Sequence, residues 1–556
     1  MTARVLVAVL AVVVAACSGG NESSTTTATQ PSSTTSGPTE STTTTAPPEQ
    51  ESGGTLVVAI STDPGHLNPA ITTSGGTHTA SELLYDGLVE LDDNGEPVPG
   101  LAESWDIEED GRVYRFHLRE GVTWHDGTPF TSADVKFAFE EVILQYHSRS
   151  AASIGQAIES LEAPDDLTIV FTFQAPYAPL LQQLNVTEAP IVARHIYEGS
   201  DPTENPANLE PVGTGPFQFV SYAPDEEIRF AANGNYFKDG PYVDEVVQRI
   251  IPETGSQVIA FEAGEVDWLW GVPGPDLARF EADDSIGLLR TGINPGGQNC
   301  IMTVSYNLDR PIFQSVDVRK AIAHAIDREA FLERILFGQG SVPAAPIHSG
   351  IGFAHGQGLD MPNYDPATAT ALLEGAGWVL GDDGVRVAQG VPGVDDGTQL
   401  SFGFLSFSSF ASYGELLRAQ LGEVGVDVVL SALEPPVFVE TVFTNRDFDT
   451  NIVSYCNGTD PEIGVRRMYI SSNIRPIPFS NSSGYANEDV DRLFDQAAVT
   501  VDPDERSPIY QEIQEILVAE LPYFWIVETV ATRAHSSRCS GFTASGHFAA
   551  TARCGP

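Results

Sequence analysis

Apolar residues recur along this chain with two different periods, and each period predicts a different kind of element. The unbroken apolar run 54–60 predicts a buried strand, and strict alternation over 105–118 and 167–173 predicts strands with one exposed face. Asp110-Gly111 interrupts the first alternating stretch with a sequence that is typical of a tight turn. The pattern therefore predicts a half-exposed antiparallel hairpin and two further strands.

Other stretches place apolar residues three and four positions apart, directly after residues that cap helices. Thr131 and Asp134 form a capping box before one such stretch. Asp317 and Asp502 are expected to cap two more helices. Because strands and helices are mixed without an internal repeat, we expect a multi-domain α/β protein, with a mainly antiparallel insertion at about 86–211.

Composition excludes several classes of function. The chain has 556 residues, with 76 Asp and Glu against 28 Lys and Arg, and a formal net charge of -48. Such a surface repels phosphates, which excludes a nucleic-acid binder and a polybasic membrane-surface protein. With 42% hydrophobic residues the chain is a folded protein, and at roughly 150 residues per domain it should form about three domains. We hypothesise that the acidity reflects a saline habitat; a stability that does not rise with salt would contradict this.

The first 54 residues are expected to lie outside the globular fold. An apolar run over 5–16 follows Arg4 and ends in small residues before Cys17, which resembles a bacterial lipobox. This predicts a signal peptide at 1–16, cleavage before Cys17 and lipid attachment to that cysteine, with an ordinary secretory signal as the alternative. Residues 17–54 are rich in Ser, Thr, Pro and Gly, a composition typical of a flexible tether.

Four more cysteines follow, and an even number in an exported chain suggests two disulfides with three alternative pairings. Proximity favours Cys539 with Cys554, which leaves Cys300 with Cys456. A catalytic thiol or a zinc site is the alternative, but the chain has no CxxC and no histidine with the spacing of a ligand partner. We therefore expect no metal site.

The common catalytic motifs are missing from the sequence. There is no HExxH, no Gly-rich loop that ends in Gly-Lys-Ser/Thr and no GxSxG. The adjacent His125-Asp126 precedes a glycine and predicts a turn, and 213–217 predicts a tight turn before a strand. Because 76 acidic residues allow countless carboxylate pairs, a secreted hydrolase stays an alternative, but we assign no catalytic residue and no cofactor.

Eight segments occur in the order of one known family over about residues 55–530. They are Leu84–Leu88, Leu101–Trp105, Phe116–Phe130, Pro211–Phe217, Asn235–Phe237, Gly264–Asp267, Asp317–Arg328 and Leu521–Tyr523. Together they resemble the extracytoplasmic solute-binding proteins of peptide and nickel-type ATP-binding-cassette importers, bacterial solute-binding protein family 5. Each segment alone is a weak signal, and the ordered set is specific.

The resemblance implies a two-lobed, periplasmic-binding-protein-like fold of type II, with an additional domain inserted in lobe one. Lobe one would comprise 55–85, 212–298 and 522–556, the inserted domain 86–211, and lobe two 299–521. It also implies a non-catalytic, monomeric receptor outside the cell membrane that captures a peptide or related polar organic solute and delivers it to a membrane permease. A sugar, an opine-like solute or a nickel chelate is the alternative ligand, and a signalling or adhesion receptor is an alternative role.

The resemblance further indicates two walls of a ligand pocket. The first wall is the segment Thr72, Thr73, Ser74 and Gly75, where some relatives place an acid. The second wall, residues 455–460, contributes the candidates Tyr455, Asn457, Gly458 and Asp460. Some relatives pair a peptide's amino terminus with an aspartate two positions after the cysteine, but this chain has Gly458 there.

Three aromatic residues outside the two walls are further candidates. Trp268 and Trp270 stand two positions apart after Glu265-Val266-Asp267, and we expect one of the two to face the core and Trp270 to face the pocket. Tyr306 is a candidate ligand contact, as is Tyr455, with plain packing as the alternative for both.

Overall fold

The computed structural model describes residues 53–92, 95–290, 299–476, 479–543 and 548–555. The predicted signal peptide, Cys17 and nearly all of the tether lie outside these ranges. The described residues all belong to one unit of the chain. In these ranges no helix combines the length and the apolar character needed to cross a membrane.

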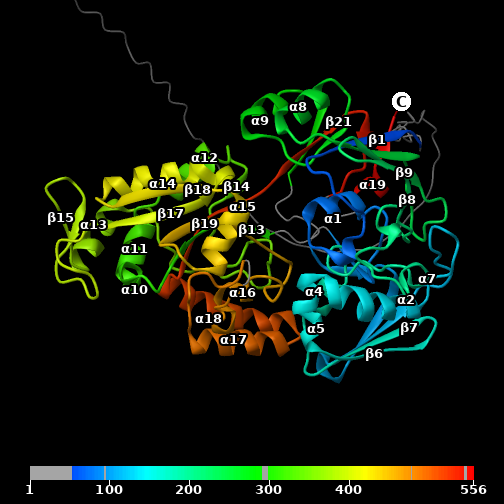
Figure 1. The fold of residues 1–556 in the computed structure, drawn as a ribbon, viewed down its shortest axis with the longest axis horizontal. Coiled ribbons are helices and arrows are strands. Elements are labelled where there is room, and N and C mark those ends of the chain that lie inside the picture. Colours follow the sequence, from blue (N-terminus) through cyan, green and yellow to red (C-terminus); the bar gives the residue numbers. More distant parts are fainter. Residues whose placement is uncertain (1–52, 93–94, 291–298, 477–478, 544–547, 556) are drawn as a thin grey trace, which may run out of the picture. The chain divides into compact units, whose positions relative to one another are not determined.

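A seven-stranded sheet gathers segments from the two ends of the described chain (Figure 1). Its strands, in spatial order, are β12 (Ile286–Arg290), β21 (Thr532–Ser536), β11 (Trp268–Leu269), β1 (Thr55–Ile60), β10 (Glu245–Ile250), β9 (Glu227–Ala232) and β8 (Phe217–Ala223). The apolar run predicted as a buried strand is β1, which pairs in parallel with β10 and β11. The helices of this part are α1 (Gly75–Ser81), α8 (Thr254–Glu262), α9 (Gly274–Glu281) and α19 (Phe548–Thr551).

The predicted insertion contains its own four-stranded antiparallel sheet. Its strands in spatial order are β4 (Ala102–Glu108), β5 (Val113–Leu118), β7 (Thr168–Phe173) and β6 (Ile158–Asp165). β4 and β5 form the predicted hairpin, with Phe116 buried and His117 partly exposed as the alternation requires. The helices are α2 (Ser132–Phe137), α3 (Leu144–Tyr146), α4 (Ser148–Ala152), α5 (Ile154–Ala157), α6 (Leu180–Gln183) and α7 (Arg194–Tyr197), and a π-helical turn at Ala138–Ile143 joins α2 to α3. The short strands β2 (Val89–Leu91) and β3 (Pro97–Pro99) pair beside this sheet.

One hydrophobic core runs through both of these regions. Leu56 of β1 and Phe230 of β9 belong to the same buried cluster as Phe116 and Phe171 of the insertion. The insertion therefore shares its core with the seven-stranded sheet.

A six-stranded sheet with its own large core forms the rest of the molecule. Its strands in spatial order are β14 (Gly340–Ser341), β20 (Tyr523–Thr529), β13 (Asn299–Tyr306), β19 (Thr450–Asn457), β17 (Ser401–Phe407) and β18 (Asp427–Leu433). Its helices are α10 (Pro311–Gln314), α11 (Val316–His324), α12 (Arg328–Arg334), α13 (Pro366–Gly375), α14 (Ala411–Glu423), α15 (Pro435–Val439), α16 (Arg466–Tyr469), α17 (Glu488–Val499) and α18 (Pro503–Glu520). The hairpin of β15 (Trp378–Leu380) and β16 (Arg386–Ala388) extends from it.

Two sequence expectations need correction in this region. β20 pairs with β13, so the chain returns to the first sheet only at β21, and the boundary expected at 522 is one strand too early. A mostly apolar strand fits either core, and its partner depends on which sheet edge it meets. The helix expected to be capped by Asp317 is capped instead by the Ser315 hydroxyl, which accepts from the Val318 N–H. Asp502 does cap α18 as predicted.

Several of the family-like segments hold one another in place. The buried carboxylate of Asp86 accepts hydrogen bonds from the Thr214 hydroxyl (2.8 Å) and the Tyr236 hydroxyl (3.0 Å). A Cβ at Gly213 would lie 1.7 Å from the Leu84 carbonyl oxygen, so this close approach requires glycine. These segments therefore pack against one another within the fold, and they do not by themselves identify a ligand site.

Candidate functional site

The first wall lies on a turn that leads into α1. Asn68 begins this turn, because its side chain accepts from the Ala70 N–H and donates to Asn208 (2.9 Å). Thr72 accepts from the Ser74 N–H through its hydroxyl, and its carbonyl contacts the His78 ring. Ser74 and Gly75 are exposed and Thr72 and Thr73 are partly exposed. The segment therefore presents hydroxyl and main-chain polar groups to its surroundings, which is the chemistry that a polar solute needs.

The two tryptophans divide between core and surface. Trp268 is fully buried and packs edge-on against Trp270, with 5.8 Å between ring centroids. Trp270 is partly exposed, and the Arg533 guanidinium lies 5.3 Å from the centroid of its ring. The expectation that one tryptophan faces the core is confirmed, and the contact of Trp270 with a ligand stays a prediction.

Both tyrosine candidates lie in the core of the six-stranded sheet. Tyr306 is fully buried and packs against Phe313, with 5.5 Å between ring centroids. Tyr455 is 1% exposed, and its hydroxyl lies 3.2 Å from that of Ser482. Neither ring reaches the surface, because strands β13 and β19 are central in the sheet. For these two residues the packing alternative describes the structure.

The Asp460 carboxylate forms an ion pair that the sequence did not suggest. Its two carboxylate oxygens accept from both terminal nitrogens of Arg506, at 2.6 and 2.9 Å, and both side chains are buried. A bidentate guanidinium pair satisfies a buried carboxylate in geometry and in charge. The Asp460 carboxylate is therefore already paired within the fold, and its contact with a ligand stays a prediction.

Asn457 and Gly458 continue the second wall beside the end of β13. Asn457 is 4% exposed, and Gly458 is partly exposed. The Gly458 carbonyl accepts from the Asn299 side-chain amide (3.1 Å), and its N–H donates to the Ile463 carbonyl (2.7 Å). Main-chain groups of this turn are thus held in a fixed position by lobe-two residues.

The structure joins the cysteines in the pairing favoured from proximity. Cys300 bonds to Cys456 across the paired strands β13 and β19, at the edge of the second wall. Cys539 bonds to Cys554 between the short strands β22 (Cys539–Ser540) and β23 (Arg553–Cys554). Among the described residues no group of three or more His, Cys, Asp and Glu side chains is arranged to hold a metal ion.

Charged residues of α4 and α16 lie near one another, which sequence reasoning did not indicate. Arg149 of α4 pairs with Glu188 at 2.9 Å, and this pair acts electrostatically on Arg467 of α16. The rings of His78 and His147 meet edge-on beside this pair, with 5.8 Å between centroids. Burial lowers the pKa of His147 to about 4, which keeps this ring neutral near pH 7. The only sequence signal was the pair Arg466-Arg467 shortly after the second wall, in a chain that is poor in basic residues.

The predicted turn at His125-Asp126 is confirmed as structural. The His125 ring accepts from the Gly213 N–H (3.1 Å) and contacts the Gly215 carbonyl (3.0 Å). Asp126 accepts from the Thr128 N–H and contacts His195. The His125 ring and the Asp126 carboxylate each hold loops of the fold together, and the two do not form an acid/base pair.

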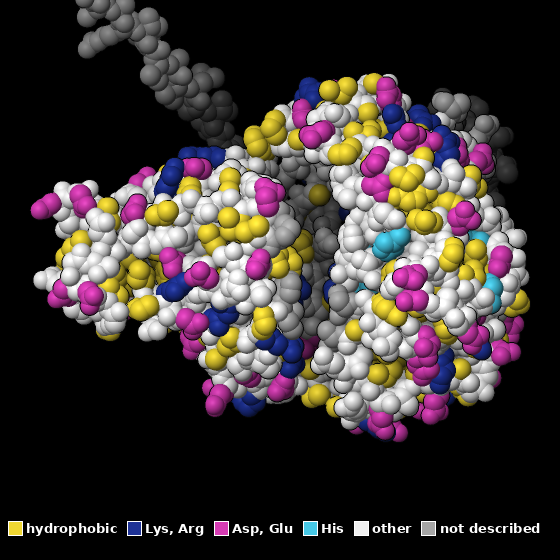
Figure 2. Space-filling model, viewed as in Figure 1, with side chains coloured by type: hydrophobic (Ala, Val, Ile, Leu, Met, Phe, Trp, Pro, Cys, Tyr) yellow, Lys and Arg dark blue, Asp and Glu magenta, His cyan; other side chains and the backbone are white. Residues whose placement is uncertain are grey.

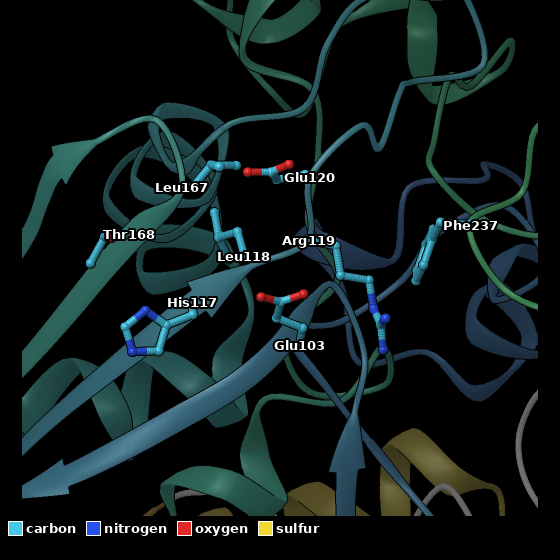
Figure 3. A pocket seen from close by; sticks show the side chains of 8 residues that line it. All are labelled: Glu103, His117, Leu118, Arg119, Glu120, Leu167, Thr168 and Phe237. Atoms are coloured by element: carbon cyan, nitrogen blue, oxygen red, sulfur yellow. The ribbon is translucent and has the colours of Figure 1, made fainter.

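A separate hollow of about 510 Å³ lies on the inserted sheet (Figure 3). Its lining consists of Glu103, His117, Leu118, Arg119, Glu120, Leu167, Thr168 and Phe237. In the close-up the two glutamates lie on either side of Leu118, and Arg119 extends towards Phe237. None of the sequence-predicted ligand residues lines this hollow, so it is not the candidate site.

On the face shown in Figure 2, charge gives no second indication of a binding site. On the face shown in Figure 2 acidic side chains are scattered and mixed with basic ones. The same face is hollowed between the part that carries the six-stranded sheet and the part that carries α1 and the insertion. The scatter of acidic side chains on this face agrees with the spread of acidic residues along the sequence.

Comparison with known proteins gives a consistent result. Residues 96–475 match the family model described as bacterial extracellular solute-binding proteins, family 5, middle. The dipeptide-binding protein of Escherichia coli K12 is 33% identical over 346 residues, which cover 58% of this chain and 63% of that protein. NikA from Brucella suis in complex with Fe(III)-EDTA has a TM-score of 0.78 at 25% identity, over 89% of this chain and 99% of that one. DppA from Helicobacter pylori in complex with the peptide STSA has a TM-score of 0.74 at 26% identity, over 91% and 98%.

Proposed function

Because the chain belongs to the bacterial extracellular solute-binding proteins of family 5, we propose that it captures a peptide or related polar organic solute and delivers it to an importer permease. The observation that carries the proposal is the division into two sheets with separate cores. The chain passes from one sheet to the other between β12 and β13 and returns between β20 and β21. Few connections between two cores are what a hinge requires.

The proposed mechanism is closure without bond breaking. A solute that contacts the first wall on one side and the second wall on the other has more contacts when the two parts are close together. It therefore shifts the population towards the closed state by the difference between its affinities for the two states. Because the members of this family are solute-binding proteins, we propose a receptor rather than an enzyme.

A peptide is the solute that the relatives favour. The E. coli relative is named a dipeptide-binding protein, and the H. pylori structure contains a peptide. The B. suis structure contains a metal chelate, so a chelated metal is the second candidate. The bidentate pairing of Asp460 with Arg506 argues against a peptide ammonium held by that carboxylate.

We further propose that the receptor is attached to the outer face of the cell membrane as a monomer. The apolar run before Cys17 would direct export, and acyl chains on that cysteine would anchor the protein at roughly 0.8 kcal/mol per buried methylene. The Ser/Thr/Pro-rich segment 17–54 would leave the receptor free to reorient towards its permease.

Mass spectrometry of the solute that co-purifies with the full chain is the direct test. We expect a small peptide or similar polar compound that is released unchanged when the protein unfolds. Adding this compound back to the ligand-free protein should raise the melting temperature and reduce the radius of gyration in solution scattering. A protein that hydrolyses its ligand, or whose scattering and melting are the same with and without every ligand tried, would refute the proposal.

A further inference from the structure

The tip of the inserted sheet contacts the part of the chain that carries the six-stranded sheet. Gly111, in the turn between β4 and β5, is buried, and a Cβ added there would lie 2.2 Å from a methyl carbon of Val501. Val501 stands in the short connection between α17 and α18. The same region supplies a main-chain hydrogen bond, in which the Ala178 N–H donates to the Ala498 carbonyl of α17 (3.4 Å). The insertion therefore meets α17 and the start of α18 through both side-chain and main-chain atoms.

A second turn of the insertion makes a similar contact. Gly95, between β2 and β3, is buried, and a Cβ added there would lie 3.1 Å from a methyl carbon of Thr459. Gly95 and Gly111 both have a positive φ, of 80° and 89°, which residues other than glycine rarely adopt. Two glycine turns of the insertion thus allow a close approach to the part that carries the six-stranded sheet.

The insertion also lies close to the buried ion pair of Asp460 and Arg506. The Tyr114 hydroxyl of β5 donates to the Tyr177 carbonyl (2.9 Å), so these two residues are fixed to one another. Burial raises the pKa of both tyrosines, and the charge of Asp460 acts on both in the same direction. The contact therefore extends from the turn at Gly111 to the residues over this ion pair.

These contacts lie far from the connections between the two large sheets. Figure 1 shows α17, α18 and the inserted sheet at the bottom of the view and β21, which follows one connection, at the top. Near that connection the Gln339 side chain donates to the Val272 carbonyl (3.1 Å) and accepts from the Thr532 N–H (3.2 Å). A rotation about the connections moves distant points most. Opening would therefore separate Gly111 from Val501 before it disturbed the bonds of Gln339.

We propose that the insertion is a latch for the closed state, and that the contact of Gly111 with Val501 holds the two parts together whatever solute is bound. The inference rests on the proposed function, in which a solute shifts the population towards the closed state. It adds that part of the stability of that state comes from contacts outside the two walls. A weaker latch lowers the closed fraction and with it the apparent affinity for every solute.

The test is a double-mutant cycle at Gly111 and Val501 in the full chain. Gly111→Ala places a Cβ against the Val501 methyl group. Val501→Ala removes that methyl group and leaves the Cβ of residue 501 at 3.4 Å from the added atom. The strain of alanine at a φ of 89° is present in both backgrounds, so it cancels in the cycle. What remains is the coupling between the two residues across the contact.

Closure is measured as a distance between spin labels at Glu162→Cys of β6 and Glu488→Cys of α17, both exposed positions, by double electron–electron resonance. A pooled library of tripeptides and tetrapeptides is the solute probe. We expect the library to enrich the short distance in the parent, and Gly111→Ala to need at least about fivefold more library for the same enrichment. Adding Val501→Ala to Gly111→Ala should restore most of the response. Val499→Ala, at an exposed position of α17, is the matched control for Val501→Ala and should leave the distances unchanged.

A variant that fills the contact from the other side keeps the test decisive if Gly111→Ala does not fold. Val501→Trp should reduce the short-distance population, and Val499→Trp, two residues away, should not. A short-distance population that is equal in these two variants would contradict the latch.

The outcomes separate the latch from the proposed function. A library response that is equal in the parent and in every variant overturns the latch and leaves the proposed function intact. An effect of Gly111→Ala that is the same with Val501 and with Val501→Ala also overturns it, as does a parent without any short-distance population. A short-distance population that depends on Gly111 and Val501 but does not respond to the library supports the latch and counts against a peptide as the solute.

Discussion

The two walls of the candidate pocket differ in how much of their chemistry is already used by the fold. The first wall keeps Ser74 and Gly75 exposed on a turn. In the second wall Tyr455 is packed in the core and Asp460 is held by Arg506. Side chains of types that suggest ligand binding can thus have their packing, hydrogen bonds and charge fully compensated by other residues of the protein. The useful distinction is whether a polar group has a partner within the fold. Among the described residues no carboxylate lies within ion-pair distance of Arg467, near the second wall.

The largest expected effect concerns the ion pair of the second wall. Asp460→Asn should lower the free energy of unfolding by about 3–5 kcal/mol, because it leaves Arg506 as a buried charge without its counter-ion. Urea denaturation measures this. Asp495→Asn removes an exposed carboxylate from Arg466 and should change stability by less than about 1 kcal/mol. An Asp460→Asn protein that stays stable but loses its solute would return Asp460 to the ligand site.

The two sides of the pocket should also respond to pH in opposite directions. On the side of α4, burial lowers the pKa of His147 from 6.5 to about 4, next to Glu188 and Arg149. The folded state then binds fewer protons than the unfolded state. The stability that His147 contributes is present above pH 6.5 and is lost as pH falls towards 4, up to about 3 kcal/mol.

Beside the second wall, burial raises the pKa of Glu462 from 4.5 to about 7, despite the nearby Arg466 and Arg506. Here the folded state binds more protons, so the contribution is present below pH 4.5 and is lost as pH rises through 7. Unfolding free energies between pH 4 and 8 should therefore show a smaller acid loss in His147→Gln and a smaller loss near neutrality in Glu462→Gln. Identical pH profiles for parent and variants would contradict both assignments.

A smaller effect is expected from Trp268 and Trp270. Trp270→Leu should weaken solute binding by about tenfold, or roughly 1.4 kcal/mol, with little change in melting temperature, because this ring is partly exposed. Trp268→Leu is the matched control and should destabilise the fold by a few kcal/mol, since its ring is fully buried. Equal affinities of the parent and Trp270→Leu would remove Trp270 from the pocket.

Local patterns predicted the elements well where a single period or cap decided them. The strand Thr55–Ile60, the hairpin of β4 and β5 and the Asp502 cap of α18 were all predicted. The cap of α11 was wrong, because Ser315 and Asp317 lie two residues apart and both are suitable capping residues. Which of the two accepts the first free N–H depends on where the preceding turn ends.

The site was harder to predict than the fold. The sequence indicated Asp460 and Tyr455, because both stand in a segment that resembles ligand-binding segments of relatives. It gave no indication that Arg506, 46 residues away, would neutralise Asp460. It also did not show that α4 would approach Arg467. Contacts between residues far apart in the chain depend on the packing of whole elements, and local residue patterns carry little information about them.

The sequence by itself determined that this is an acidic α/β protein with an ordered set of family segments, because charge, apolar period and motif order are properties of the chain. The tertiary structure decided that β20 belongs to the six-stranded sheet and that Asp460 forms an ion pair with Arg506. It also left Arg467 charged beside the second wall without a carboxylate partner among the described residues. Whether a charge is compensated depends on the position of every neighbouring group, and only the folded chain fixes those positions.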